Sequence, residues 1–324
     1  MQGSFLRRLV AAVVLMLGAS CAMAQAWPGK PVTIVVGFAP GGSTDKLARL
    51  LGQAMQEHLG QQVIIDNKPG AAGNVAAQAV AASAPNGYTL FMTTLSSAAV
   101  NPWIYPNARL DPIKSYEPVA LVARYPLVMA VNPGLNLKTT ADVIRYLREK
   151  KDAVSFSSAG TGSPAHLAGE LINAALGTKM MHVPYKGGGP AMLAAMSGEV
   201  ALTIETSPAM IPHVKSGKLT GIAVSSATRS RALPDLPTLA ESGVPGFEVT
   251  SWAGLVAPAG TPAEVLEKLQ NAIVRAMDNP KLQAALDADG AAASYLPGEK
   301  FRAFNESELK RWGEVVRSAK VRAE

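Results

Sequence analysis

A segment rich in glycine and hydroxyl residues, FAPGGSTD at residues 38–45, separates two patterns of apolar residues. Before it, Val32 to Val36 form a short run of mostly β-branched residues, as expected of a strand buried on both faces of a parallel sheet. After it, apolar residues recur at steps of three and four from Leu47 to Leu59, and Gly60 follows. The pattern predicts a strand, a tight turn and a helix that ends at Gly60.

The same order of strand, turn and helix recurs along the chain. Glycine-rich turns follow predicted strands at residues 69–74, 158–163 and 186–190. Two long apolar segments, Val119 to Val131 and Gly246 to Pro258, interrupt the series. Such alternation predicts an α/β fold with two parallel or mixed sheets flanked by helices. We expect two lobes, residues 25–125 with 250–324 and residues 126–249, joined by the two apolar segments as crossing strands.

Residues 1–24 are typical of a secretory signal peptide. Arg7 and Arg8 precede an apolar run from Leu9 to Leu17, which is far below the roughly 20 residues that span a bilayer. The small-residue site Ala22-Met23-Ala24 follows. We therefore expect cleavage near Ala24 and a periplasmic location; a retained membrane anchor is the alternative.

The single cysteine, Cys21, precedes the expected cleavage site. Lipid attachment there ranks second to simple cleavage, because Gly18 stands where a lipoprotein signal has a large aliphatic residue. The mature chain then contains no thiol and no disulfide, so packing must stabilise it.

The net charge of +6 does not indicate a nucleic-acid partner. Basic residues are scattered, and the densest cluster, Lys310 to Arg322, is interrupted by Glu314 as in a solvated helix. A nucleic-acid role would favour a basic stripe and does not suit an exported chain.

The turn at 38–45 has the composition of an anion site. A helix N-terminus presents unpaired N–H groups and the positive end of the helix dipole. Gly41 and Gly42 permit close approach of the backbone, and Ser43 or Thr44 can cap the helix. Asp45 would compete with an anion for the same donors, so we expect it to orient a water or a ligand hydroxyl. A turn that only caps the helix and binds no ligand would have the same kind of sequence. The number of such turns, two in each lobe, is what favours a binding site in a cleft between the lobes.

Motifs for catalysis, cofactors or metals are weak or missing. GTGSPA, residues 160–165, matches the dinucleotide fingerprint but lacks the acidic residue expected after the following strand. No P-loop, G-x-S-x-G or H-E-x-x-H sequence occurs, and the four histidines lack metal-ligand spacing. We expect no cofactor and no metal. Of the histidines only His166 is expected near the cleft.

Six segments give the chain a specific resemblance: FAPGGSTD, NKPGAAGN, APNGYTL, SSAGTGSPAHLAGEL, HVPYKGGGPAMLAAMSGEV and TSWAGLVAPAGTP. Together they resemble the Bug family, the extracytoplasmic solute receptors of tripartite tricarboxylate transporters. The resemblance implies a type II periplasmic binding-protein fold that closes on a small carboxylated solute.

By position, the resemblance implies ligand-binding residues in both lobes. They are Phe38, Gly42, Ser43, Asp45, Ala71, Ala72, Gly73, Thr93 and Ser97 in the first lobe, and Ser158, Gly160, Thr161, Gly162, His166 and Glu205 in the second. Two of these residues depart from the family pattern: Ala72 replaces a common glycine, and Glu205 stands where aspartate is usual.

The expected function is that of a monomeric receptor that delivers a mono-, di- or tricarboxylate or an acidic amino acid to membrane transporter subunits. Two alternatives stay open. One is an exported hydrolase or isomerase that uses His166 with Glu205 or Asp45. The other is a sensor that passes the liganded state to a membrane kinase.

Overall fold

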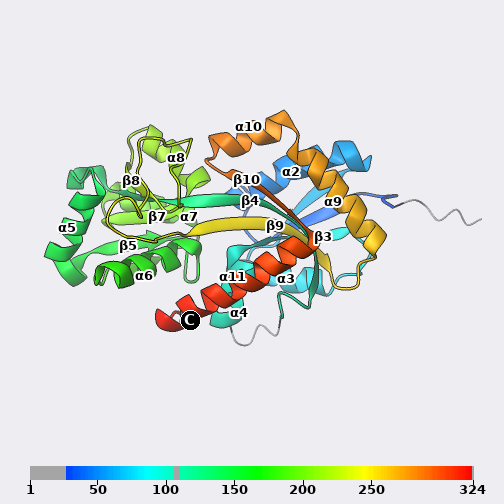
Figure 1. Cartoon of the computed structure of the whole chain (residues 1–324), viewed down its shortest axis with the longest axis horizontal. Helices are drawn as coiled ribbons and strands as arrows, with labels where there is room; N and C mark the ends of the chain where they lie inside the picture. Colours follow the sequence, from blue (N-terminus) through cyan, green and yellow to red (C-terminus); the bar gives the residue numbers. More distant parts are fainter. Residues whose placement is uncertain (1–26, 106–109, 323–324) are drawn as a thin grey trace, which may run out of the picture.

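The computed structural model describes residues 27–105 and 110–322, so the expected signal peptide and Cys21 lie outside the described residues. Figure 1 shows an elongated molecule with helices around a mixed sheet and two long strands along its middle. The strand order is β2-β1-β3-β9-β4-β7-β5-β6, with β10 and β8 also paired to β4. The predicted α/β fold with parallel and mixed strands is confirmed.

The first sheet segment is built on three parallel strands, β1 (Val32–Val36), β2 (Val63–Asn67) and β3 (Thr89–Thr94). Both faces of β1 are buried, because Ile34 and Val35 belong to different hydrophobic clusters. This double burial explains the unbroken apolar run in the sequence. The antiparallel β9 (Thr250–Pro258) pairs with β3 and completes this side.

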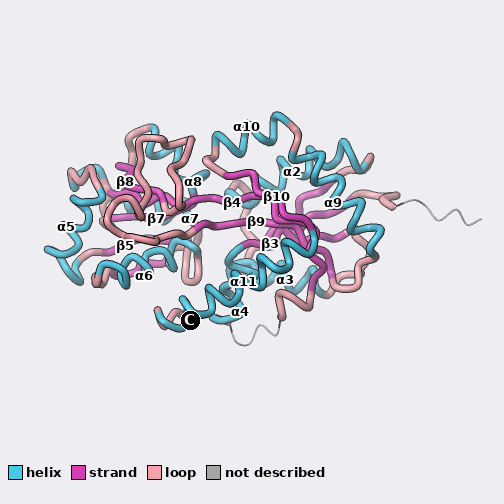
Figure 2. The backbone as a smooth tube through the Cα atoms, viewed as in Figure 1, coloured by secondary structure: helices cyan, strands magenta, loops and turns pink. Residues whose placement is uncertain are grey.

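The second sheet segment repeats the arrangement with β5 (Ser155–Ser158), β6 (Met181–Pro184) and β7 (Leu202–Thr206), which are parallel. β8 (Thr220–Val224) pairs antiparallel with β4. The magenta strands of Figure 2 run from one segment into the other through β4 and β9.

The long strand β4 (Tyr116–Val131) belongs to both segments. Residues 116–126 pair with β9, and residues 127–131 pair with β7 and β8. The expected crossing segments therefore correspond to β4 and β9, although β9 begins at Thr250 rather than at Gly246. The division into lobes 25–125 with 250–324 and 126–249 stays a prediction.

The helices lie on the outside of the sheet (Figure 2). They are α2 (Ser43–Leu59), α3 (Asn74–Ala81), α4 (Asn101–Ile104), α5 (Thr140–Lys150), α6 (Pro164–Leu176), α7 (Gly188–Ser197), α8 (Ser207–Lys215), α9 (Ala263–Met277), α10 (Pro280–Ala288) and α11 (Gly298–Ser318), with short helical turns at Ala71–Gly73, Ser96–Val100, Pro133–Leu135 and Lys151–Ala153. α2 ends as predicted at Gly60, which has a left-handed φ of 65°. None of the described helices is long and apolar enough to cross a bilayer.

The sequence patterns did not predict α4, α8, α10 or the strand β10 (Ala292–Pro297). α8 begins directly after β7, so no turn residues mark its start. It also contains Pro212, a residue that usually interrupts a helix, so its composition does not predict one. β10 pairs antiparallel with β4, a partner more than a hundred residues away in the sequence. Such elements depend on tertiary contacts rather than on local pattern.

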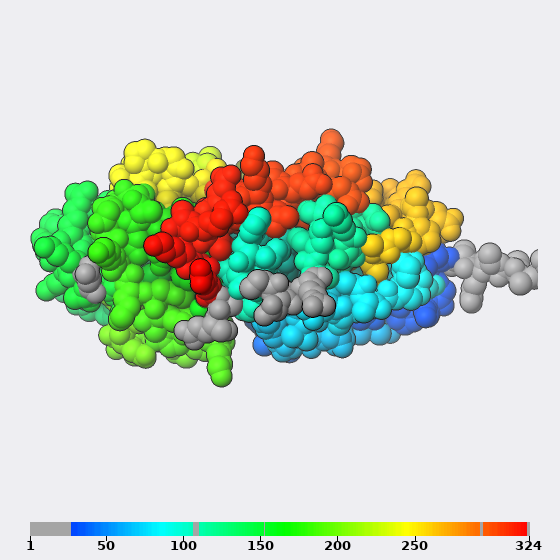
Figure 3. Space-filling view, turned by 90° about the horizontal axis from the view of Figure 1, so that it is seen from below, coloured from blue at the N-terminus to red at the C-terminus, as the bar shows by residue number. Residues whose placement is uncertain are grey.

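The last helix, α11, is fixed to β9 by a buried carboxylate. Trp252 of β9 is 1% exposed, and its indole N–H donates to Oε2 of Glu308 at 3.0 Å. The indole N–H of Trp312 donates to the same oxygen, also at 3.0 Å. Figure 3 shows α11 in red across the middle of the molecule, and it contacts both β4 and α6. Trp252 therefore packs between the strands and this helix.

Replacing Glu308 tests this anchor. Glu308→Ala leaves two buried indole N–H groups without an acceptor, so we expect the free energy of unfolding in urea to fall by about 3 kcal/mol. Glu308→Gln keeps an acceptor oxygen and should cost less than half as much. Glu306→Ala, at an exposed position of the same helix, is the matched control. Equal stabilities for Glu308→Ala and Glu306→Ala would show that the shared carboxylate does not stabilise the fold.

Candidate functional site

The first turn of the candidate site lies between β1 and α2. Gly41 has a left-handed φ of 85°, and Gly42, the N-cap of α2, has a φ of −76°. The expectation that Ser43 or Thr44 caps this helix is wrong, because Gly42 is the N-cap and no side chain bonds the cap. Ser43 is the first helical residue, and the first N–H groups of α2 are left for another acceptor.

Asp45 fixes the shape of this turn. Its Oδ2 accepts hydrogen bonds from the Gly41 N–H at 2.9 Å and Arg49 Nε at 3.0 Å, and its Oδ1 accepts one from Asn67 Nδ2 at 2.9 Å. Asn67 Nδ2 also donates to the Phe38 carbonyl at 3.0 Å. Burial raises the pKa of Asp45, but its hydrogen bonds outweigh burial and hold that pKa below its usual range. Protein donors thus already use both oxygens of this carboxylate.

The second turn, Ala71–Gly73, has a left-handed backbone. φ is 46° at Ala71 and 51° at Ala72, a region that residues with a Cβ rarely adopt. Asn101 stabilises it, because its Nδ2 donates to the Ala72 carbonyl and to Asn74 Oδ1, both at 3.0 Å. The left-handed φ is also a physical reason why glycine suits position 72.

The third group follows β3 and lies against the second turn, which in turn lies against Phe38 of the first. Ser97 Oγ accepts the Thr94 N–H at 2.9 Å and lies 3.1 Å from Thr93 Oγ1. A Cβ on Gly73 would lie 3.5 Å from the Ser97 Cβ and 3.8 Å from the Phe38 ring. The structure therefore brings Phe38, Gly73 and Ser97 together, although they are distant in the sequence.

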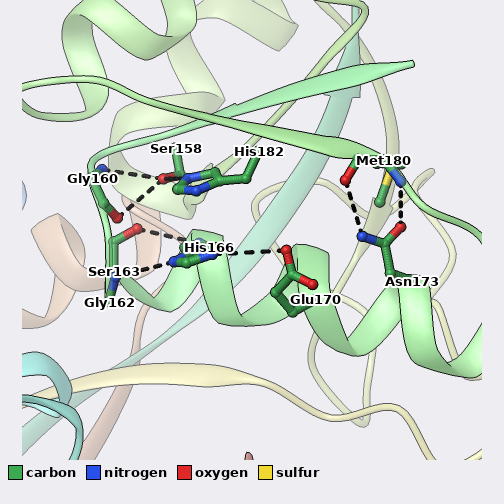
Figure 4. Close-up of polar contacts among 9 residues, drawn as sticks. All are labelled: Ser158, Gly160, Gly162, Ser163, His166, Glu170, Asn173, Met180 and His182. Carbon is green, nitrogen blue, oxygen red and sulfur yellow. Dashed lines mark hydrogen bonds and ion pairs between the residues drawn. The ribbon is translucent and has the colours of Figure 1, made fainter. Parts of the chain in front are cut away.

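In the second sheet segment, the turn after β5 is held by two histidines (Figure 4). Ser158 Oγ lies 2.6 Å from His182 Nε2 and accepts the Gly160 N–H at 3.1 Å. The Gly162 N–H donates to His166 Nδ1 at 3.1 Å. His166 thus lies beside the turn as expected, whereas His182 was not predicted to take part. Thr161 lies in the same turn and is partly buried.

The two imidazole rings stack with centroids 3.7 Å apart and planes 8° from parallel. Burial lowers the pKa of His166 to about 4. Burial, with a contribution from His166, lowers the pKa of His182 to about 3. Both rings are therefore neutral near pH 7. Because His166 Nδ1 is an acceptor, its proton is on Nε2, which faces Glu170 Oε1 at 3.7 Å.

Glu205 lies near the carboxyl end of β7, beside the start of α7. Its Oε1 accepts the Thr206 N–H at 2.7 Å. A side chain at Gly188 would collide with the Glu205 carboxyl group. Burial raises the pKa of Glu205.

Two contacts join these groups across the molecule. A side chain at Gly162 would collide with Ile104 of α4, so the turn after β5 lies against the helix that follows Ser97. On the other side, Ser207 Oγ donates to the Asp289 carbonyl at 2.7 Å, and Lys46 Nζ lies 2.6 Å from Asp289 Oδ1. The start of α8, next to Glu205, is thereby linked to α2.

The catalytic pairs of the enzyme alternative are not formed. His166 Nδ1 is bonded to Gly162, and its Nε2 faces Glu170 rather than Glu205 or Asp45. Asp45 is bonded to Arg49 and Asn67.

Asn67, Asn101 and His182 support the turns but were not predicted from the sequence. Their roles come from partners that are distant in the sequence: Phe38 and Ala72 lie 29 residues from their partners, and Ser158 lies 24 residues from His182. Near each of these three residues, the sequence shows just a polar residue at the end of a strand or within a buried segment, and this pattern does not identify a partner.

Comparison with known proteins identifies relatives along nearly the whole chain. The sequence model of a family described as "Tripartite tricarboxylate transporter family receptor" matches residues 47–321. The protein BugT of Bordetella pertussis is 36% identical over 295 residues, which cover 91% of this chain and 90% of BugT.

Two solved structures of similar fold carry ligands. Rpa4515 of R. palustris with adipate is 35% identical, with a TM-score of 0.87, and the match covers 91% of this chain and 99% of that one. MatC of Rhodopseudomonas palustris with bound malate is 33% identical, with a TM-score of 0.81, and the match covers 90% and 100%.

Because the stacked histidines are buried in their neutral form, we expect part of the free energy of unfolding to be lost at acid pH. Their folded-state pKa values lie below the ordinary 6.5, so the unfolded chain binds protons that the folded protein excludes. Stability should therefore be lost as the pH falls from about 6.5 towards about 4. In the double variant His166→Gln, His182→Gln, the urea midpoint should depend less on pH in this window. The exposed His58→Gln is the control, and an equally steep loss in the double variant would contradict the assignment.

Proposed function

The chain belongs to the tripartite tricarboxylate transporter receptor family, and we therefore propose that it binds a small carboxylate in the periplasm and delivers it to membrane transporter subunits. The family is described as one of transporter receptors, and a similar structure, that of MatC, holds malate. We propose the periplasm as the location because residues 1–24 have the pattern of a secretory signal.

The observation that carries the carboxylate proposal is the N-terminus of α2. This 17-residue helix begins at a glycine turn without a side-chain cap, so its first N–H groups and its dipole favour an anion. The nearby cations are already paired, since Arg49 bonds Asp45 and Lys46 bonds Asp289. A carboxylate at this turn would be held by the backbone, with the turns at Ala71–Gly73 and Ser97 beside it.

The proposed mechanism is closure of two lobes about β4 and β9. The first lobe contributes its turns around Gly42, Ala72 and Ser97, and the second contributes those around Gly160 and Glu205. A ligand that contacts both sets stabilises the closed state through contacts that the open state lacks.

The ligand class is a small carboxylate, including mono-, di- and tricarboxylates and acidic amino acids. The similar structures hold adipate and malate, both of which are dicarboxylates. We propose that the protein acts as a monomer.

Thermal shift against a panel of carboxylates tests this function. A ligand at about 100 times its Kd stabilises the folded state by about 2.7 kcal/mol, which raises the melting temperature by several degrees. At least one carboxylate should do so in protein that was unfolded, dialysed and refolded to remove bound solute. If a folded, ligand-free sample responds to no carboxylate, the proposed function is wrong.

Gly42→Val tests the turn itself. The backbone of Gly42 suits any residue, and a Cβ there would lie 3.7 Å from its nearest neighbour, the Ala39 carbonyl oxygen, so the fold should be retained. The valine methyl groups would occupy space that ligand oxygens need, and calorimetry should show at least a tenfold loss of affinity, about 1.4 kcal/mol. Wild-type affinity in a folded variant would mean that this turn does not contact the ligand.

A further inference from the structure

Asp45 places a negative charge inside the turn that is proposed to bind a carboxylate. It lies in the first turn of α2, after the N-cap Gly42, and is 3% exposed. Its hydrogen bonds hold its pKa below the usual range, so the carboxylate is ionised near pH 7. A ligand carboxylate at the same turn would be repelled by this charge, because the repulsion of two anions is poorly screened in a buried position.

The oxygens of Asp45 do not cap α2. Oδ2 accepts the N–H of Gly41, which precedes the N-cap, and Oδ1 accepts Asn67 Nδ2, both at 2.9 Å. No side chain of the described residues bonds the N-terminal N–H groups of this helix. Asp45 therefore adds a negative charge to the turn and leaves free the donors that a carboxylate would use.

Arg49 compensates the charge of Asp45. Its Nε donates to Oδ2 at 3.0 Å, and its Nη2 lies 2.9 Å from Oδ1, so the guanidinium group contacts both carboxylate oxygens. Nη2 also donates to Asn67 Oδ1 at 3.2 Å. Such two-pronged contacts fix the orientation of a guanidinium group. The Arg49 side chain, which is 53% exposed, is thus held against Asp45 and Asn67.

No other cation pairs with Asp45 among the described residues. Lys46, the next residue along α2, lies 2.6 Å from Asp289 Oδ1. Lys68, which follows β2, lies 2.9 Å from Asp66 Oδ2. Without Arg49, the turn would therefore keep a buried carboxylate with no cationic partner.

We propose that Arg49 is a positioning residue for ligand binding that acts through Asp45 and does not touch the ligand: its charge cancels that of Asp45, so that the N-terminus of α2 attracts a carboxylate. The inference rests on the proposed function. The turn needs the hydrogen bonds of Asp45 to hold the Gly41 N–H and Asn67, but the charge of Asp45 opposes an anionic ligand. The ion pair with Arg49 keeps the hydrogen bonds and removes the opposition.

The first experiment compares Arg49→Gln with Arg49→Lys by calorimetry. Adipate is the probe, replaced by the carboxylate with the largest thermal shift if adipate does not bind. Arg49→Gln keeps a donor but loses the charge, so affinity should fall by at least about fivefold. Arg49→Lys keeps a cation four residues after Asp45, so affinity should stay within about twofold of wild type.

Stability separates this role from a structural one. An exposed ion pair contributes little to folding, so the melting temperature of both ligand-free variants should lie within about 3 °C of wild type. A residue that only stabilised the turn would lower the melting temperature, and lysine would not restore affinity selectively.

Arg145→Gln is the matched control. Arg145 Nη2 lies 2.8 Å from Oδ1 of Asp142, an acidic residue in the first turn of α5. The substitution therefore removes the same charge from the same kind of pair. α5 lies at the opposite end of the molecule from α2 (Figure 1). Affinity in this variant should stay within about twofold of wild type.

The second experiment repeats Arg49→Gln in an Asp45→Asn background. Asparagine has no charge to cancel, so Arg49→Gln should change affinity there by less than about twofold. The comparison is made within one background, so any effect of Asp45→Asn on the shape of the turn cancels. If Asp45→Asn does not fold, the contrast between Arg49→Gln and Arg49→Lys decides alone.

The outcomes separate the two proposals. Wild-type affinity in Arg49→Gln overturns the inference, as do equal losses in Arg49→Gln and Arg49→Lys or a failure of Arg49→Gln to fold. A similar loss in Arg145→Gln would show a general effect of net charge, and an undiminished loss in the Asp45→Asn background would show that Arg49 acts on the ligand directly; both overturn it. All of these results leave the proposed function intact, whereas failure of every carboxylate to bind the wild-type protein overturns both.

Discussion

A backbone that binds an anion must be held in shape by buried side chains, and this requirement organises the candidate site. The Asp45 carboxylate joins the Gly41 N–H to Asn67, and Asn101 holds the left-handed turn at Ala72. Neither carboxylate nor amide provides a positive charge to a ligand. Their effect is to keep N–H groups pointing in fixed directions, so that little reorganisation is needed when an anion binds.

In the second sheet segment, too, the side chains that hold the turn provide no positive charge to a ligand. The turn after β5 is held by two neutral imidazoles. The buried carboxyl group of Glu205, on β7, has no cationic partner among the described residues. If the proposed site binds a carboxylate, its selectivity depends on hydrogen-bond geometry more than on net charge. The strands β4 and β9 connect the two segments, and the hydrogen bond from Trp252 of β9 to Glu308 fixes α11 to this connection.

The sequence was most informative where local pattern determines structure. The strand at Val32–Val36 and the helix that ends at Gly60 were predicted from apolar spacing and a glycine stop, and the two crossing strands from long strand-like segments between the α/β units. The segments shared with the Bug family led to the correct family and fold. The helix cap was predicted wrongly, because Asp45 rather than Ser43 or Thr44 bonds the turn. Asn101, His182 and β10 could not be predicted, since their partners are far away in the sequence.

We propose that main-chain N–H groups, rather than lysine or arginine side chains, hold the ligand. A crystal structure of the receptor with the carboxylate that stabilises it most would decide between the two. We expect one carboxylate within hydrogen-bond distance of the N–H groups at Gly42 to Thr44, with no lysine or arginine in contact with it. A carboxylate held by a basic side chain, or bound away from these turns, would show that the main chain is not the anion site.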